Sequence, residues 1–373
     1  MTPNSAFDYI VVGGGPAGLC AIAKLIALNI PPKKIAWIDP HFEAGDFGTC
    51  LSAGSGVPGN TTVESYLRVI SAMNCILEAQ GLAPVLNTNI HHLNPNTTCT
   101  LNEASKPFKT LTHQFQRLVC AIKENVTAIH ETPNKVSVLI DKTTITANHV
   151  ILATGASPKN MNPSMPLKKI IDCNIAFIAS ELKKFLSDSI NTTSVAVVGS
   201  SHSAALAVMQ LLKLNCEVHH FMVGEYRYAE SKITPEGEAY TKFDNTGLKG
   251  EVARFTKDLN NKQYHRYSAQ NKAQITTLLN QHESKFTHLV VAIGYETSNT
   301  LTINHHPLST YAYNPRNLKL NGLSHITGLG IAFPPKIIGH EGETEYAVGV
   351  GKFWATVNDP NVMEAWQCEA LPA

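Results

Sequence analysis

Three glycines, Gly13, Gly15 and Gly18, have the spacing best suited to chemistry in this chain. In a turn between a strand and a helix, the first glycine permits a tight exit from the strand and the second lets the backbone approach a pyrophosphate. The third lets the helix pack on the strand, and the helix N-terminus adds amide donors and a partial positive charge. The predicted nucleotide contacts are Gly13, Gly14, Gly15, Pro16, Ala17 and Gly18.

The flanking sequence contains the elements that such a turn requires. Residues 8–12 are predicted to form a buried parallel strand, an apolar helix runs from about Pro16 to Leu28, and residues 35–39 form a second strand. Asp39 ends that strand, where an acid accepts hydrogen bonds from a ribose diol, and Pro40 follows it. With all of this context present, a dinucleotide site is favoured over a glycine-rich turn of purely structural use.

A second, weaker version of the turn begins at Gly199, between a strand at 194–198 and a helix at 204–214. It reads Gly199-x-Ser201-x-x-Ala204, and Ser200, Ser201 and Ser203 offer hydroxyl donors to phosphate. No acid ends the following strand, predicted at 217–222, and Arg227 comes soon after it. This pattern favours NADPH over NADH, and the alternative is a domain that keeps the fold without the nucleotide.

The remaining elements repeat one plan, a strand, a turn and a helix, in two halves of the chain. A long loop at 40–62 is predicted to face a ligand, because long ordered loops tend to carry function. A polar segment at 242–250 is interpreted either as a lid over substrate or as a surface loop. Helices are expected at 63–79, 111–124 and 346–357, a small antiparallel meander at 126–131, 135–140 and 143–147, and separate strands at 150–153 and 286–293.

The Gly13 turn, Asp39, the meander and the segment Ala153-Thr154-Gly155 together resemble flavoproteins with two dinucleotide-binding domains. This superfamily includes the glutathione reductase, thioredoxin reductase and flavin monooxygenase types. The resemblance implies an α/β fold of two Rossmann-like, three-layer domains, with a discontinuous FAD domain (1–157 and 301–373) carrying the meander and an NAD(P)H-binding-like domain (158–300). It implies FAD as cofactor and NADPH or NADH as donor, and adds Cys50, Val126, Thr154, Gly155 and Gly328 to the cofactor contacts.

The chain departs from parts of this pattern. The segment from Gly48 to Ser55 resembles the stretch in which glutathione reductase types carry two cysteines five apart, but Ser55 occupies the second position. A serine forms no disulfide, so relay chemistry by a dithiol is not expected. Around Gly328 the glycines are present without the acid that usually follows them. Ala292-Ile293-Gly294-Tyr295 is similar to a motif of flavin monooxygenases and N-hydroxylating enzymes, although the signature that precedes their second turn is missing.

Composition excludes several other classes of function. Of 373 residues 16% are charged and the net charge is +1, so neither nucleic acid nor anionic lipid is an expected partner. We find no apolar run long enough to span a bilayer and no basic and apolar leader, which favours a cytoplasmic location. The eight cysteines form no CxxC pair, and adjacent histidines on a strand point to opposite faces, so no metal is predicted. Oligomeric state is left open.

The leading hypothesis is an FAD-dependent oxidoreductase that passes hydride from NAD(P)H to flavin and electrons on to O2 or a small organic acceptor. One alternative is a flavin-dependent monooxygenase of the N-hydroxylase type, which requires a dry pocket. Another is an FAD-binding sensor or scaffold without turnover, suggested by the weak second turn. A last alternative is thiol chemistry at Cys50 alone, the one candidate for a catalytic residue.

The Cys50→Ser variant tests that last alternative. Because Ser55 removes the partner for a disulfide, we expect Cys50 to pack near the flavin without reacting, and NAD(P)H consumption by the variant to equal that of the wild type. The rate of NADPH oxidation, followed by absorbance, is the measurement. A large loss of turnover with normal flavin content would restore a thiol mechanism.

Overall fold

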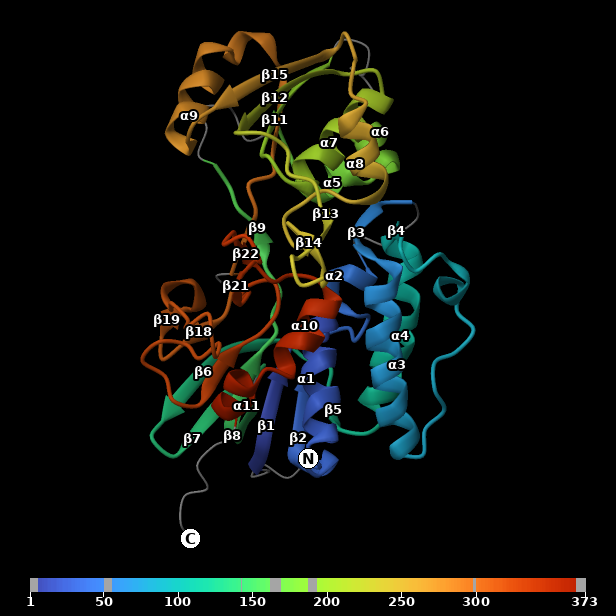
Figure 1. Cartoon of the computed structure of the whole chain (residues 1–373). Helices are drawn as coiled ribbons and strands as arrows, with labels where there is room; N and C mark the ends of the chain where they lie inside the picture. The colour runs from blue at the N-terminus through green and yellow to red at the C-terminus, as the bar shows by residue number, and fades with distance from the viewer. Residues whose placement is uncertain are drawn as a thin grey trace.

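The structure is a computed structural model that describes residues 6–49, 56–141, 143–161, 169–186, 193–297 and 300–366. Two sheets form its framework (Figure 1). The first has the strand order β19-β18-β6-β7-β8-β1-β2-β5, with β20 also paired to β8, and the second has the order β10-β16-β11-β12-β15. The mixed α/β architecture, with Rossmann-like parallel strands in both sheets, confirms the predicted fold class.

The first sheet begins with the predicted βαβ unit. Strand β1 (Ala6–Val12), helix α1 (Pro16–Ala27) and strand β2 (Ile35–Ile38) follow in order, and β1 pairs in parallel with β2 and with β8. Strand β5 (Cys120–Ile122) extends the parallel part beyond β2, and β20 (Ile326–Gly328) pairs with β8. Because parallel strands end at one edge, the turn after β1 lies beside the last residues of β8.

The predicted strands at 143–147 and 150–153 are one continuous strand, β8 (Thr143–Leu152), and the prediction of two strands was wrong. Its first half pairs antiparallel with β7 (Lys135–Ile140), which pairs with β6 (Val126–Thr132), and this is the predicted meander. Its second half pairs in parallel with β1. The meander residues Ile129 and Val138 share a core with Ile10 and Ile38, so the meander covers one face of the parallel strands.

Helices cover the opposite face of the first sheet. Helix α3 (Val63–Ala79) has the predicted bounds, and α10 (Val350–Val357) packs with α1 and α3 in one apolar core. The helix predicted at 111–124 instead runs from Leu101 to Gln116 as α4, because Thr100 and Glu103 form a capping box at its start. The segment after it turns back into β5, which pairs with β2.

The second sheet is parallel throughout its described pairs. Its strands are β10 (Ile170–Ile171), β11 (Ser194–Val198), β12 (Glu217–Val223), β15 (Tyr264–Ala269) and β16 (His288–Val291). Apolar residues of α5, α6, α7 and α8 share a core with one face, and residues of α9 pack on the other. These helices are α5 (Cys173–Phe177), α6 (Ala179–Leu186), α7 (His202–Lys213), α8 (Gly250–Lys257) and α9 (Lys272–Gln281).

Two crossing segments join the sheets, and β9 (Ser157–Pro158) pairs antiparallel with β17 (Tyr295–Glu296) between them (Figure 1). The remaining elements are α2 (Gly45–Gly48), β3 (Pro58–Thr62), β4 (Thr98–Thr100), β13 (Glu230–Ile233), β14 (Ala239–Lys242), β18 (Thr302–Ile303), β19 (His306–Pro307), β21 (Lys336–Ile338), β22 (Thr344–Tyr346) and α11 (Pro360–Trp366). No helix in the described part of the chain is long and apolar enough to cross a membrane.

His149 on β8 makes the first sheet sensitive to acid. Its side chain is buried, and its Nε2 lies 3.0 Å from the Thr327 hydroxyl on β20. Burial, together with the positive charges of His325 and Lys319, lowers the pKa of His149 to about 3. The unfolded chain takes up this proton near pH 6.5, so stability is complete above that pH and falls as the pH drops toward 3.

Replacing His149 with Gln should therefore flatten the acid side of the stability profile. Glutamine can keep a hydrogen bond to Thr327 but does not titrate. Between pH 7 and 4.5 the wild type should lose about 2–3 kcal/mol more unfolding free energy than the variant. Urea unfolding at both pH values measures this, with the exposed His306→Gln as control. Equal losses in wild type and variant would show that His149 takes up a proton in the folded state.

Candidate functional site

The turn after β1 is possible only with glycine at two positions. Gly13 has a φ of +110°, and a Cβ there would lie 2.2 Å from the Ala153 carbonyl oxygen at the end of β8. A Cβ on Gly18 would lie 1.9 Å from the Gly13 carbonyl oxygen, so a side chain there would push α1 away from the strand. The Trp37 indole donates a 2.9 Å hydrogen bond to the same Gly13 oxygen and fixes the turn on β2.

Gly15 has a different role, because space remains where its side chain would be. The nearest atom to a Cβ on Gly15 would be the Gly45 Cα at 4.0 Å, and the backbone there is in an ordinary extended conformation. Gly15 is the N-cap of α1, no side chain caps this helix, and Pro16 occupies its first turn. The helix end therefore presents its backbone donors and positive end to the space in front of it, as an anion site requires.

Asp39 lies at the end of β2, directly beside this turn. Its carboxylate accepts hydrogen bonds from the backbone amides of Gly14 at 2.6 Å, Phe42 at 2.6 Å and His41 at 2.9 Å. A carboxylate has about four acceptor positions, so it can accept a further bond from a sugar hydroxyl. These three bonds also explain the orientation of Asp39, which spacing alone did not reveal.

A cavity of about 690 Å³ lies in front of the turn and brings most of the predicted residues together. Among its lining residues are the predicted contacts Gly13, Gly14, Gly15, Pro16, Ala17, Asp39, Pro40, Val126, Thr154 and Gly155. The predicted ligand-facing loop contributes as well, through Glu43, Gly45, Asp46, Phe47 and Thr49. Thr61, near the end of the same loop, lines the cavity too. Sequence reasoning missed Tyr66, which no local motif marks, and Asn174, Gly349 and Phe353, which come from distant parts of the chain.

One polar atom at the cavity is buried without a hydrogen-bond partner among the described residues. The Thr154 hydroxyl oxygen is buried and has no hydrogen-bond partner in the part of the chain that the structure describes. A buried polar group without a partner costs free energy, so such atoms in native proteins usually bond a water or a ligand. Together with the open space at Gly15, this oxygen shows that the residues fit a polar dinucleotide cofactor.

Gly328 does not line this cavity among the described residues, although the prediction placed it at the cofactor. It lies inside β20, where a Cβ would be 2.2 Å from the Phe333 ring. The next residues, Leu329, Gly330 and Ile331, line the cavity instead. Gly330 has a φ of +95°, and a Cβ there would lie 2.7 Å from the Ala17 Cβ. The backbone therefore passes close to α1 at Gly330, two residues after the glycine that was predicted to contact the cofactor.

The second turn repeats the geometry of the first at its first glycine. A Cβ on Gly199 would lie 2.2 Å from the Ala292 carbonyl oxygen, and Gly199 has a φ of +144°. Ser201 is the N-cap of α7, no side chain caps this helix, and Ser201 itself is exposed. The hydroxyl of Ser203 contacts Tyr295, which lines the cavity in front of the first turn. The two turns are thus joined through Tyr295.

The end of β12 differs from the prediction in one respect. The strand extends to Val223, so His219 and His220 lie in its first half, and the acid Glu225 follows the strand end by two residues. Glu225 forms an ion pair with Arg266 on β15. Arg227 is exposed, and its guanidinium lies 5.3 Å from the centre of the Phe243 ring. Arg227 therefore stays accessible to a ligand on this side of the second turn.

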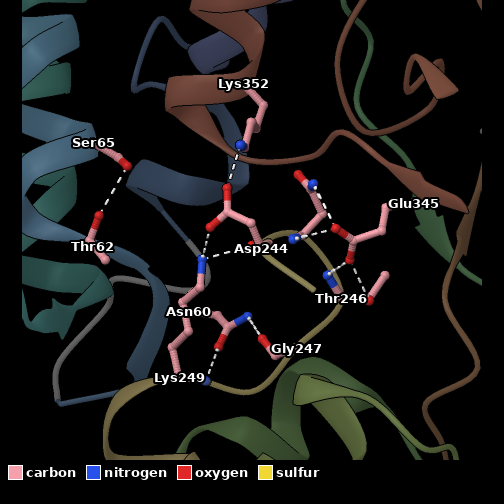
Figure 2. A network of polar contacts seen from close by, with 10 residues as sticks. Asn60, Thr62, Ser65, Asp244, Thr246, Gly247, Lys249, Glu345 and Lys352 are labelled. Atoms are coloured by element: carbon pink, nitrogen blue, oxygen red, sulfur yellow. Dashed lines mark hydrogen bonds and ion pairs between the residues drawn. The ribbon is translucent and has the colours of Figure 1, made fainter. Parts of the chain in front are cut away.

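The polar segment 244–249 is neither a free lid nor a surface loop, because it is bonded to β3, β22 and α10, which lie outside the second sheet and its helices (Figure 2). The Asn60 side chain on β3 donates to the Gly247 carbonyl oxygen at 2.9 Å and accepts from the Lys249 amide at 2.8 Å. Asp244 forms ion pairs with Lys249, at 2.6 Å, and with Lys352 on α10. We call this segment and its partners Asn60, Glu345 and Lys352 the clamp.

Glu345 on β22 is the most buried charge in the clamp. Its carboxylate accepts bonds from the Thr246 amide at 2.8 Å and the Thr246 hydroxyl at 2.5 Å, and from the backbone and side chain of Asn245 at 3.3 Å (Figure 2). Burial alone would raise the pKa of Glu345, but these hydrogen bonds outweigh it and hold the pKa below its usual value. The charged carboxylate thus ties β22 to the segment that precedes α8.

Cys50 and Ser55 lie outside the described residues, so the role of Cys50 stays a prediction. The six cysteines within the described part, Cys20, Cys75, Cys99, Cys120, Cys173 and Cys216, are free thiols. Burial raises the pKa of Cys173 to about 12 and that of Cys99 to about 11, and it also raises the pKa of Cys20. These three thiols are poor nucleophiles, since the thiolate is the reactive form.

Comparison with known proteins agrees with this geometry. The model of the pyridine nucleotide-disulphide oxidoreductase family matches residues 7–313. A monooxygenase of Paecilomyces divaricatus, AgnR1, is 29% identical over 388 residues, which cover 92% of this chain and 94% of that protein. Among solved structures, the cadaverine monooxygenase DfoA of Erwinia amylovora has a TM-score of 0.61 at 12% identity, covering 97% of this chain and 95% of that one. A bacillithiol disulfide reductase of Staphylococcus aureus has a TM-score of 0.59 at 13% identity, covering 97% and 100%.

The fold carries a nucleotide-type turn on each of two sheets, with a cavity in front of the first turn, and this arrangement is typical of an oxidoreductase that binds two nucleotides. The chain belongs to the pyridine nucleotide-disulphide oxidoreductase family, whose model covers most of its length. It is therefore an FAD-dependent oxidoreductase, and NAD(P)H is the electron donor typical of the family.

The glycines of the first turn predict two distinct mutant phenotypes. In Gly15→Ala the added methyl group enters open space, so the protein without cofactor should melt at the wild-type temperature, whereas FAD affinity should fall at least about tenfold because the pyrophosphate is kept away. In Gly18→Ala the methyl group meets the Gly13 oxygen, so the melting temperature itself should fall. Thermal melts of the cofactor-free proteins and flavin titrations separate the two. Normal FAD affinity in Gly15→Ala would contradict this assignment of the site.

Proposed function

We propose that this chain is a flavin-dependent monooxygenase that oxidises NADPH, transfers one atom of O2 to a small organic substrate and releases the other as water. The observation that carries the proposal is the single cavity that reaches from the Gly13 turn to Tyr295, which is bonded to Ser203 of the second turn. Such a cavity lets two cofactors meet at their reactive ends. When bound, FAD supplies the chemistry that exchanges electrons between NADPH and O2.

Oxygen is favoured as the final acceptor over a disulfide for two reasons. The sequence has serine at position 55, where a dithiol relay requires a second cysteine. The Paecilomyces relative, which aligns over nearly the whole chain, is named a monooxygenase. An amine or another soft nucleophile is the proposed substrate class, because such atoms accept an electrophilic oxygen most readily.

We assign FAD to residues 1–157 and 301–373, and NADPH to residues 158–300. The backbone amides of the Gly13 turn would hold the pyrophosphate, Asp39 the ribose, and Thr154 the remaining polar edge of the cofactor. At the second turn, Ser200 and Ser201 would donate to the phosphates of NADPH, and Arg227 would pair with its 2′-phosphate. The clamp would hold the two halves so that hydride transfer occurs over a short distance.

A reductase that passes electrons to an organic acceptor, and an FAD-binding sensor without turnover, are the competing functions. The sensor is favoured by one observation, the exposed Ser201 in place of the second glycine, which weakens phosphate binding. Cytoplasmic location and the absence of nucleic-acid partners stay predictions from the sequence.

Stopped-flow mixing of the FAD-loaded protein with NADPH tests the proposal. Without oxygen, NADPH should bleach the visible flavin absorbance faster than NADH does. After O2 is admitted, the flavin should reoxidise, and either cadaverine or thioanisole, as nitrogen and sulfur nucleophiles, should lower the yield of hydrogen peroxide and give an oxygenated product.

The outcomes separate the three functions. Flavin that stays yellow with both nucleotides would support the sensor. Bleaching followed by quantitative peroxide release with every nucleophile, and rapid reoxidation by an added quinone, would support the reductase. A product that incorporates labelled oxygen from O2 would support the monooxygenase.

A further inference from the structure

Three metal-ligating side chains meet at the edge of the second sheet, away from the cavity. Glu217 and His219 are two apart on β12, so their side chains lie on one face, and His265 on the edge strand β15 pairs directly with His219. The His265 Nε2 lies 3.0 Å and the His219 Nε2 3.6 Å from the same Glu217 oxygen. One ligand atom from each residue lies within 4.8 Å of the other two.

His219 is the member of the group that needs an explanation. Its side chain is only 4% exposed, and its Nδ1 lies 3.0 Å from the Tyr267 hydroxyl. Its Nε2 is buried and makes no hydrogen bond within the described part of the chain. Burial lowers the pKa of His219, with Glu217 opposing and His265 adding to the shift. When Nδ1 donates to Tyr267, the Nε2 lone pair faces a carboxylate, an unfavourable contact unless a cation lies between them.

We propose that Glu217, His219 and His265 bind a divalent transition-metal ion, for which Zn2+ is the best fit, with water as a fourth ligand. Two imidazole nitrogens and one carboxylate oxygen are a common zinc ligand set. Tetrahedral coordination at bonds of about 2.1 Å places ligand atoms about 3.4 Å apart, close to the 3.6 Å and 3.0 Å between the Glu217 oxygen and the Nε2 atoms of His219 and His265. The ion would satisfy the His219 nitrogen and remove the repulsion from the carboxylate.

Tyr267 has the role of an outer-shell residue in this site. Its hydroxyl lies 3.0 Å from the His219 Nδ1 and holds the ring in place, and when it accepts the Nδ1 proton it leaves Nε2 free to bind metal. Glu217 and His265 are partly exposed, so an ion can enter from solvent without opening the fold. The sequence argument against a metal concerned adjacent histidines, and it holds for His219 and His220, since His220 Nε2 bonds instead to the Gly199 carbonyl oxygen.

The position of the site indicates a role in stability and not in the redox reaction. Glu217 and His219 lie at the amino end of β12, whereas the second turn follows the carboxyl end of the neighbouring parallel strand β11. A bound ion would link β15, the edge strand, to the interior strand β12. Metal should therefore raise the melting temperature and leave NADPH-driven flavin reduction unchanged.

Zinc titration of the FAD-loaded full chain, first freed of metal by chelator, tests the proposal. We expect one tightly bound zinc per chain after gel filtration and a rise in Tm with zinc. His265→Gln should weaken zinc binding at least tenfold without changing the metal-free Tm greatly, because this side chain is partly exposed. Tyr267→Phe should weaken it by about tenfold through loss of ring orientation.

The matched control is His306→Gln, which removes an exposed histidine on β19 and should keep wild-type zinc binding. Zinc affinity and stoichiometry in His265→Gln equal to those of the wild type would overturn the proposal, because binding would then reside at thiols or other histidines. Wild-type protein that binds no zinc would overturn it as well. Flavin reduction by NADPH serves as a check that each variant is folded.

Discussion

The contact between the first turn and the end of β8 determines where the groups that line the cavity lie. The Gly13 backbone passes so close to the Ala153 carbonyl oxygen that a side chain at Gly13 would lie 2.2 Å from it. Because this approach holds β1, β8 and the start of α1 together, the helix end, Asp39 and Thr154 face a common space. The cavity is a consequence of that packing, which also positions its polar groups.

Strand β8 belongs both to the antiparallel meander and to the parallel part of the first sheet. Its first half belongs to the meander and its second half to the parallel sheet, so the apolar residues Val138 and Ile10 can share one core. The sequence predicted extended chain on both sides of residue 148 but wrongly divided β8 there, where the alternation of apolar and polar residues changes. Periodicity reports which face is buried, and it cannot report that the pairing partner changes within a continuous strand.

Local signals predicted the parts of the site that local sterics control, and long-range contacts account for what was missed. The steric roles of Gly13 and Gly18, and the place of Asp39 beside the turn, followed from spacing within one βαβ unit. Gly330 was missed because its requirement comes from Ala17, more than three hundred residues earlier. The start of α4 at the Thr100 and Glu103 capping box could have been found locally, since the two residues have the usual spacing. The pairing of His219 with His265 needed the strand register, which no local pattern carries.

The two turns are alike at their first glycine and differ at their last position, and this difference explains why the clamp matters. A Cβ on Gly199 would lie as close to the Ala292 oxygen as one on Gly13 would to Ala153, yet Ala204 tolerates the methyl group that Gly18 cannot. The methyl group of Ala204 keeps the start of α7 from approaching its turn as closely as Gly18 allows in α1, so phosphate contacts there would be weaker. A nucleotide held loosely by its phosphates needs the protein to fix its reactive end instead. Asp244 and Glu345 would supply that constraint, because their contacts join the segment before α8 to β22 and α10.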